Sequence, residues 1–370
     1  MVGAQVQARL AAAGGTPCLL FTTNPGLEDI VAEEYAHRAA ALGVTPVEAV
    51  RRPFGFGGHT LVYLPEASPA AREAALALRS VHHVVRPLYA FELADGSPAA
   101  LVTIADHLRR RGVPDLEGGP SFRVTTHRNG DHAFTSLDVQ RAAGAALVER
   151  YAGRVDLTGH DVEVRVDVIE RTCIVGVQLT RQALSRRHLR PYSPRAALKA
   201  NVAYALLHLA RLEPGSGPLL DPFCGSGTIL LEAAALFPDL EIEGGDLDPE
   251  AVAGTRLNLA TAGLEHRVRL WCADASQLSE THPPGRFSAI VTNPPYGVRL
   301  GRNLDFHAFY RRLLEQAAVV LRPGGRLVLI AWKRGVVDRL NRELGLFTSR
   351  HVRVVETGGI YPRVYVLERR

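Results

Sequence analysis

The sequence contains no uninterrupted apolar run of about 18 residues, the length that a membrane-spanning helix requires. Its first residues, MVGAQVQARLAAAGG, also have no long apolar core after a basic start, so no secretory leader is expected. Repeats and low-complexity tracts are absent. With 46% hydrophobic and 22% charged residues in 370, we expect a cytoplasmic globular protein of two or three domains and no membrane partner.

Cysteine is scarce, and the four cysteines lie far apart in the chain. Cys18, Cys173, Cys224 and Cys272 form no CxxC pair, so the sequence encodes neither a zinc site nor a disulfide framework. We therefore expect reduced thiols and no metal.

Lysine is nearly absent, with two lysines against 41 arginines. This preference for arginine runs through the whole chain, so it reflects the overall composition and does not indicate a binding site. The distribution of charge is more informative, because residues 181–212 carry seven basic and no acidic residues in a chain of net charge +5. Such a segment between domains is either a solvated linker or a surface for a polyanion, since arginine pairs bidentately with phosphate.

The second half of the chain alternates short apolar runs with amphipathic helices, which is typical of a parallel α/β sheet. We expect its strands within residues 218–223, 240–246, 268–274, 287–293 and 325–332. The helix before the last of these shows i, i+3, i+4 periodicity and should end at RPGG, residues 322–325, in a tight turn. Residues 351–369 predict an antiparallel hairpin at the sheet edge.

The first half of the chain predicts an α+β region. Residues 24–43 predict a helix with Leu27, Ile30, Val31 and Tyr35 on one face. Residues 161–179 alternate apolar and polar side chains, which predicts a half-buried hairpin. A join between two small α+β units is expected within residues 60–95.

The stretch DPFCGSGT places Asp221 at a strand end and two glycines, Gly225 and Gly227, in the turn before a helix. Glycine permits close approach of a ligand, and the helix amino end offers free N–H groups, so a nucleotide-like ligand is indicated. A dinucleotide fingerprint would need glycine where this chain has Leu230, and no GK[ST] follows for a P-loop. Without a pyrophosphate, the carboxylate can face a cationic amino group such as that of S-adenosylmethionine.

Two further acids follow the next two strands. Asp246 can accept hydrogen bonds from both ribose hydroxyls, and Asp274 can accept one from an adenine amino group. Either could instead be only a helix cap, a role that suits Asp248 before Pro249. Three acids at successive strand ends beside a glycine loop favour a ligand site, because open α/β sheets bind ligands at this edge.

Together, the motifs DPFCGSGT, GGDLD, CADA, TNPPYG and LRPGGRLVLI resemble those of class I S-adenosylmethionine-dependent methyltransferases that act on nitrogens of planar groups. The resemblance implies a Rossmann-like α/β domain with a seven-stranded, mostly parallel sheet whose seventh strand is antiparallel. It also implies that RPYSPRAALKA, residues 190–200, closes over the methionine end of the cofactor. The expected cofactor-binding residues are Pro194, Asp221, Phe223, Cys224, Gly225, Gly227, Thr228, Asp246, Leu247, Asp274, Ala275 and Asn293.

The loop TNPPYG, residues 292–297, carries the expected catalytic residues Asn293, Pro294 and Tyr296. An exocyclic base amine is a poor nucleophile because its lone pair is delocalised. The Asn293 side-chain oxygen and the Pro294 carbonyl can accept its hydrogens and stabilise the growing positive charge, while Tyr296 offers a stacking face. The same loop occurs in DNA amino-methylases and in release-factor glutamine methylases, so it leaves the substrate open.

Residues 121–180 resemble the THUMP domain, an RNA-binding module of tRNA-modifying enzymes. The resemblance rests on the strand with Arg123, on HRNGDHAFTS, on VDL at residues 155–157 and on the final hairpin. TNPGLEDIVAEE resembles the opening of the ferredoxin-like domain that usually precedes it. The expected domains are ferredoxin-like (1–68), THUMP (69–182), an arginine-rich linker with the start of the methyltransferase (183–213) and the Rossmann-like methyltransferase domain (214–370).

The whole chain is most similar to tRNA guanine-N2 methyltransferases, in particular those acting at position 6. THUMP domains generally bind the single-stranded acceptor end of tRNA, which implies a target in the acceptor stem, flipped out to reach Asn293. Contacts to RNA are expected from Arg123, Arg128, Arg181, Arg186 and Arg187.

Two alternatives stay open at this point. A guanine-N2 methyltransferase of large-subunit rRNA would carry the same loops. A non-catalytic tRNA-binding or chaperone protein would be expected to lose Asp221, Asp246 or Asn293, and all three are present.

Overall fold

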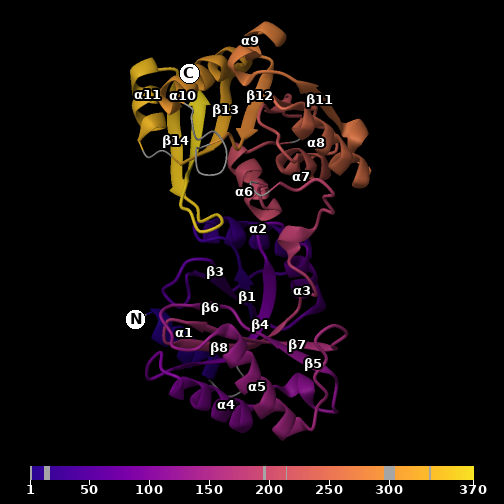
Figure 1. The fold of residues 1–370 in the computed structure, drawn as a ribbon, viewed down its shortest axis with the longest axis vertical. Helices are drawn as coiled ribbons and strands as arrows, with labels where there is room; N and C mark the ends of the chain where they lie inside the picture. The colour runs from indigo at the N-terminus through magenta and orange to yellow at the C-terminus, as the bar shows by residue number, and fades with distance from the viewer. Residues whose placement is uncertain (1, 12–16, 195–196, 214, 296–304, 333–334) are drawn as a thin grey trace. The chain divides into compact units, whose positions relative to one another are not determined.

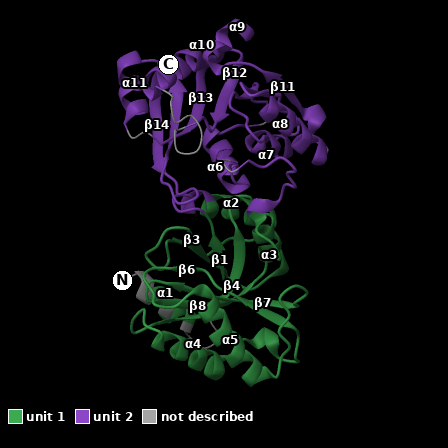
Figure 2. Cartoon of the chain, viewed as in Figure 1, with its two compact units in different colours: residues 1–23, 31–184 green, residues 24–30, 185–370 purple. Residues whose placement is uncertain are grey.

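The computed structural model describes residues 2–11, 17–194, 197–213, 215–295, 305–332 and 335–370. The chain forms two compact units: unit 1 comprises residues 1–23 and 31–184, and unit 2 comprises residues 24–30 and 185–370 (Figure 2). Among the described residues, no helix combines the length and the apolar character needed to cross a bilayer.

Unit 1 begins with a ferredoxin-like arrangement (Figure 1). Its elements are β1 (Cys18–Thr22), α2 (Glu28–Ala41), β2 (Glu48–Arg51), β3 (His59–Tyr63), α3 (Pro69–Leu76) and β4 (His83–Glu92). The strands lie in the order β2-β3-β1-β4 with antiparallel neighbours, as the βαββαβ fold requires. This arrangement reaches residue 92, past the predicted boundary at residue 68.

The same sheet continues into the second half of unit 1, because β4 also pairs with β8. The further elements are α1 (Val2–Ala11), α4 (Ala99–Arg111), η1 (Pro114–Leu116), β5 (Phe122–Thr125), β6 (Arg128–Asn129), α5 (Ser136–Tyr151), β7 (Val162–Ile169) and β8 (Thr172–Gln178). Helices α4 and α5 pack on one face, where Ile104 and Leu147 join Val166 in a common core. The two α+β regions expected from the sequence therefore share one sheet.

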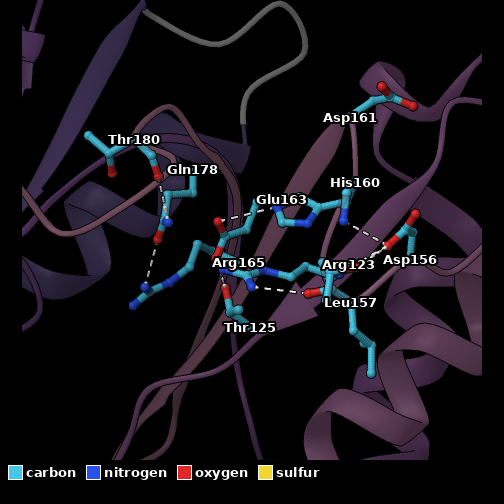
Figure 3. A network of polar contacts seen from close by, with 12 residues as sticks. Arg123, Thr125, Asp156, Leu157, His160, Asp161, Glu163, Arg165, Gln178 and Thr180 are labelled. Carbon is cyan, nitrogen blue, oxygen red and sulfur yellow. Dashed lines mark hydrogen bonds and ion pairs between the residues drawn. The ribbon is translucent and has the colours of Figure 1, made fainter.

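The β7–β8 hairpin is buried on both faces, so the predicted half-buried hairpin is wrong in this respect. Glu163, Arg165 and Asp167 occupy the face that alternation assigns to solvent, yet each is at most 9% exposed. They stay buried because they have polar partners. Arg165 donates to Asp167 at 2.8 Å. It also donates to Gln178 at 2.9 Å, and Gln178 donates to the Thr180 carbonyl (Figure 3).

Unit 2 contains a seven-stranded sheet in the order β11-β10-β9-β12-β13-β15-β14 (Figure 1). The strands are β9 (Leu219–Asp221), β10 (Ile242–Asp246), β11 (Val268–Cys272), β12 (Phe287–Thr292), β13 (Leu321–Ala331), β14 (Phe347–Val354) and β15 (Arg363–Arg369). The first five in this order are mutually parallel, and β15 is antiparallel to both of its neighbours. The predicted Rossmann-like sheet is confirmed, with β15 inserted between β13 and the edge strand β14.

Helices cover both faces of this sheet. They are α6 (Ala200–Ala210), α7 (Thr228–Leu236), α8 (Pro249–Thr261), α9 (Leu278–Thr281), α10 (Phe306–Val320) and α11 (Val336–Leu344), with short 3-10 turns η2 (Leu184–Arg186), η3 (Glu265–Arg267) and η4 (Ala275–Gln277). Alternate residues of β13 divide between two cores: Val328 and Ile330 join α6 and α7, and Leu327 and Leu329 join α10 and α11.

The RPGG stretch differs from the predicted free turn, because residues 322–325 lie within β13 as a bulge. Leu321 pairs with Phe287, and the next paired residue, Arg326, faces Ala289. Gly324 has φ +73°, which lets the extra residues loop out without breaking the strand.

Residues 24–30 belong to unit 2, although the sequence places them in the amino-terminal domain. Leu27 and Ile30 are buried in the core that contains α6 and α7, whereas Val31 and Tyr35 are buried in unit 1. The predicted apolar face of α2 is therefore shared between two cores. Asp29 also forms a two-point ion pair with Arg353, at 2.8 Å for each oxygen.

Candidate active site

Four polar side chains lie along one edge of the unit 2 sheet. Asp221 ends β9, Asp246 ends β10, Asp274 lies two residues beyond β11, and Asn293 directly follows β12. These strands are parallel neighbours, so their carboxyl ends meet at the same edge. The structure thus brings together the residues that the motifs single out.

The glycine loop between β9 and α7 needs glycine for two different reasons. Gly225 and Gly227 have φ of +54° and +74°, the left-handed region that other residues rarely adopt. A Cβ atom at Gly227 would also lie 2.7 Å from Cγ2 of Thr255. At the position where a dinucleotide fold has its third glycine, Leu230 instead packs beside Gly244.

Asp246 holds the glycine loop in place. Its Oδ2 accepts the Gly225 N–H at 2.9 Å, and its Oδ1 accepts the Asp248 N–H at 3.1 Å. Each carboxylate oxygen has two lone pairs, so each retains an acceptor site for a ligand hydroxyl. The next residue, Leu247, is 68% exposed and offers an apolar surface beside this carboxylate.

Asp221 is fully buried and is linked to β12 by a hydrogen bond. Thr292 donates its hydroxyl to Asp221 Oδ1 at 2.7 Å, and the Phe223 N–H donates to the same oxygen at 3.2 Å. Burial raises the pKa of Asp221 to about 7, against the effect of these two hydrogen bonds and with a smaller contribution from the Asp246 charge. A cationic ligand group beside this carboxyl would favour its ionised form.

The remaining predicted cofactor residues lie in mixed surroundings. Asp274 is exposed and caps η4 by accepting the Ser276 N–H at 2.8 Å, with Ala275 buried behind it. Cys224 is buried, and its N–H donates to the Gly245 carbonyl. Phe223 packs edge-on against Phe309, with ring centroids 5.6 Å apart.

Thr228 and Pro194 contrast in exposure. Thr228 is buried at the start of α7 and donates to the Leu198 carbonyl at 3.2 Å, whereas Pro194 is exposed.

The side-chain oxygen of Asn293 accepts no hydrogen bond from any other described residue. Its Oδ1 is buried, and no hydrogen-bond partner for it exists among the residues that the structure describes. A buried acceptor without a partner carries an energetic cost that a bound donor would remove. Pro294 is buried next to it, and the predicted stacking residue Tyr296 lies outside the described residues.

The five arginines predicted to contact RNA differ in their surroundings. Arg181 and Arg186 are exposed, with no partner in the described part of the chain. Arg123 is 29% exposed and bonds to Glu163 at 2.9 Å and to the Leu157 carbonyl at 3.4 Å (Figure 3). Arg128 contacts the Gly130 carbonyl and His132. Arg187 is 16% exposed and lies 3.4 Å from the buried Glu232.

Sequence reasoning missed several residues that shape this edge. Thr292 belongs to the TNPPYG motif, but the motif predicts no role for it. No sequence pattern singles out Thr255, Asn258 or Glu232. Thr255 donates to the Gly225 carbonyl at 2.8 Å, and Asn258 donates to the Ser226 carbonyl at 2.9 Å. They are polar residues buried within helices, and only their burial in the fold distinguishes them from surface positions.

The chain matches two protein families and is similar to proteins of known structure. Residues 187–363 match the RMKL-like methyltransferase domain, and residues 105–178 match the THUMP domain. The chain is 39% identical to a tRNA (guanine(6)-N2)-methyltransferase of Thermus thermophilus, over 94% of this chain and 98% of that protein. It is 30% identical to a protein of the same name from Archaeoglobus fulgidus, over 67% of this chain and 70% of that protein.

The crystal structure of TrmN from Thermus thermophilus is similar to this fold along nearly the whole chain. The TM-score is 0.76 at 37% identity, covering 96% of this chain and 100% of that one. Similarity of this extent, over both the THUMP and the methyltransferase regions, shows that the chain belongs to the family of tRNA (guanine(6)-N2)-methyltransferases.

Proposed function

We propose that this protein methylates the exocyclic N2 of a guanosine in tRNA, at position 6 of the acceptor stem, with S-adenosylmethionine as methyl donor. The observation that carries the proposal is Asn293 Oδ1, which has no hydrogen-bond partner among the described residues and lies at the sheet edge that also holds Asp221 and Asp246. The name of the Thermus thermophilus relative supports the choice of tRNA and of guanine N2. A tRNA substrate also agrees with the expected cytoplasmic location.

The residues at this edge fit S-adenosylmethionine. Asp221 would hold its amino group, Asp246 its ribose hydroxyls and Asp274 its adenine amino group. Asp221 suits a cation because it is buried beside a second carboxylate, and Asp246 keeps free lone pairs on both oxygens. The bound cofactor supplies an electrophilic methyl group on a sulfonium.

The protein's part in methyl transfer is to accept hydrogen bonds from the amine. Asn293 Oδ1 and the Pro294 carbonyl each accept one N2 hydrogen, which draws the nitrogen toward tetrahedral geometry. Both acceptors stabilise the positive charge that grows on N2, so no strong base is needed before transfer, and N2 releases one of its protons to water afterwards. Proline at 294 and 295 restricts the backbone and reduces the cost of ordering these acceptors.

Substrate RNA is held by phosphate contacts and by base stacking. Of the five predicted arginines, Arg181 and Arg186 are exposed without protein partners among the described residues, so these two are the most available to bind phosphate. Arg123 and Arg128 would contribute from the THUMP region, while Arg187 also faces Glu232. The guanine must leave its base pair to reach Asn293, and Tyr296 would stack on it.

The activity is tested with labelled cofactor and unmodified tRNA transcripts that carry either G6 or an A6–U pair. Nuclease digestion and mass spectrometry should find N2-methylguanosine at position 6 of the first transcript only. Methyl transfer to large-subunit rRNA fragments but not to tRNA would overturn the choice of substrate.

The mechanism is tested with Asn293→Ala, which should lower kcat by about 10²–10³-fold, as for the loss of a positioned group that stabilises transition-state charge. Asn341→Ala is the matched control, because Asn341 Oδ1 is also buried without a partner among the described residues but lies on α11. Its kcat should stay near that of the unmodified protein. An unchanged rate in Asn293→Ala would refute the proposed role of the loop.

A further inference from the structure

The arginine-rich segment at residues 187–194, which we call the strap, is anchored to unit 2 by buried groups. His188 Nε2 lies 2.6 Å from Oε1 of Glu232, a residue of α7 with no exposed surface. Arg190 donates to the Thr228 hydroxyl at 2.6 Å and to the Leu198 carbonyl at 3.1 Å. The strap is therefore attached to the helix that begins at the glycine loop.

Asn258 contacts both the strap and the cofactor edge. This residue of α8 is fully buried. Its Oδ1 accepts the Tyr192 N–H at 3.0 Å, and its Nδ2 donates to the Tyr192 carbonyl at 2.7 Å and to the Ser226 carbonyl at 2.9 Å. One side-chain amide thus binds the strap at two points and the glycine loop at a third.

A second residue on the same face of α8 completes this support. Thr255, one turn before Asn258, donates to the Gly225 carbonyl at 2.8 Å, so two successive carbonyls of the glycine loop face α8. A trans peptide directs its N–H opposite to its carbonyl, so the bond to Gly225 turns the Ser226 N–H away from α8. The orientation of the loop's peptide groups, which a ligand would meet, therefore depends on these side chains.

We infer that Asn258 is a positioning residue of the cofactor site, which holds the glycine loop and the strap in fixed register before S-adenosylmethionine binds. The inference rests on the proposed function, because it assigns the ligand of the glycine loop. Asn258 does not act on the methyl group or on RNA. Its loss should weaken cofactor binding while leaving kcat at saturating cofactor and KM for tRNA close to those of the unmodified protein.

The test measures binding of S-adenosylhomocysteine by isothermal titration calorimetry to the full-length protein. Asn258→Ala removes all three hydrogen bonds and should raise Kd by about tenfold or more, as expected when two or three positioned hydrogen bonds are lost. Asn258→Asp keeps the acceptor for the Tyr192 N–H but loses both donors, so it should also raise Kd. If the alanine variant does not fold, the aspartate variant alone decides the matter.

Asn201→Ala is the control for general destabilisation. Asn201 is as fully buried as Asn258 and also lies in a helix, but its amide donates to Asn24. This variant should lower the midpoint of thermal unfolding yet keep Kd within about twofold, since its contacts lie away from the glycine loop. Equal weakening by Asn201→Ala would overturn the inference, because the effect would then reflect lost stability.

The outcomes separate the inference from the proposed function. An unmodified protein that fails to bind S-adenosylhomocysteine would refute the proposed cofactor. An unmodified protein that binds it while both Asn258 variants bind it within twofold would overturn the inference alone. A rise in KM for S-adenosylmethionine with unchanged KM for tRNA would support the positioning role, because purely structural damage would alter both.

Discussion

Asp221 carries a carboxyl group that the protein surrounds almost completely. Burial raises the pKa of this group to about 7, while hydrogen bonds from Thr292 and Phe223 favour the ionised form and Asp246 opposes it. In the free protein, an appreciable fraction is therefore neutral at pH 7. Only the ionised form can pair with the amino group of the proposed cofactor.

Cofactor affinity should therefore depend on pH around neutrality. As pH falls from 8 to 6, the ionised fraction of Asp221 falls roughly tenfold, so Kd for S-adenosylhomocysteine should rise by about tenfold. Calorimetric titrations at half-unit pH intervals measure this dependence. Asp221→Asn should bind weakly at every pH in this range, without the tenfold trend.

Thr292→Val sharpens the same prediction. The valine removes the hydroxyl that stabilises the ionised carboxyl, so the pH midpoint of binding should move upward by roughly one unit. A midpoint that stays in place in this variant would show that the Thr292 contact does not influence Asp221.

Among the elements of unit 2, strand β14 and residues 24–30 are joined by an ion pair between residues 324 positions apart in the sequence. Arg353 binds both carboxylate oxygens of Asp29 and also donates to the Gly26 carbonyl at 3.1 Å. Its side chain is only 12% exposed. Removing it leaves a partly buried carboxylate without its main partner.

Arg353→Ala should lower the free energy of unfolding of unit 2 by about 2 kcal/mol. Denaturant titration followed by tryptophan fluorescence measures this loss in unit 2 specifically, because both tryptophans, Trp271 and Trp332, belong to that unit. Arg350→Ala is the control on the same strand. Arg350 pairs with Glu368 at 2.6 Å but is 53% exposed, so its loss should cost at most about 1 kcal/mol.

The pH dependence of this ion pair follows from Asp29. Burial raises its pKa, but hydrogen bonds and charge from Arg353 outweigh burial and hold the pKa below its usual 3.8. The pair's contribution is therefore present above about pH 4 and lost as pH falls through the lowered pKa. The difference between Arg353→Ala and the unmodified protein should shrink below that pH, and a difference that persists there would contradict this account.

At the scale of the whole molecule, the basic residues between 181 and 212 dominate the charge balance. The chain has a net charge of +5, and this segment alone carries seven basic and no acidic residues. Part of that charge is directed inward, since Arg187 and Arg190 anchor the strap. Of the five arginines predicted to contact RNA, Arg181 and Arg186 are exposed and can meet a polyanion.

Binding of tRNA should therefore weaken steeply with salt. Replacing both Arg181 and Arg186 with alanine should reduce the slope of log Kd against log salt by about 1.4 to 1.8, because each phosphate contact contributes roughly 0.7 to 0.9. Filter binding at salt concentrations from about 50 to about 300 mM measures this slope. Arg311→Ala is the control, since Arg311 already pairs with Glu343 at 2.7 Å. An unchanged slope in the double variant would place the RNA contacts elsewhere.

The sequence could predict features that follow from local pattern. Apolar runs and glycine turns located the strands of unit 2, and Asp221, Asp246 and Asn293 were found because parallel strands end at one edge. Alternation failed for β7, because it cannot show that a polar face is covered by other polar groups. The sequence also could not distinguish Arg187 from its neighbour Arg186. Both are arginines of one basic segment, but Arg187 lies beside the buried Glu232 whereas Arg186 is exposed.

Local pattern in the sequence was thus enough to indicate the class of fold and the glycine loop and to predict the acceptors of the 292–297 loop, since each depends on residues a few positions apart. Which distant side chains support them follows from the three-dimensional packing alone. Asn258 meets Tyr192 across 66 positions, and Arg353 meets Asp29 across 324. Periodicity indicates which apolar side chains are buried, but the burial of a polar group and the identity of its partner are set by the packing of whole elements.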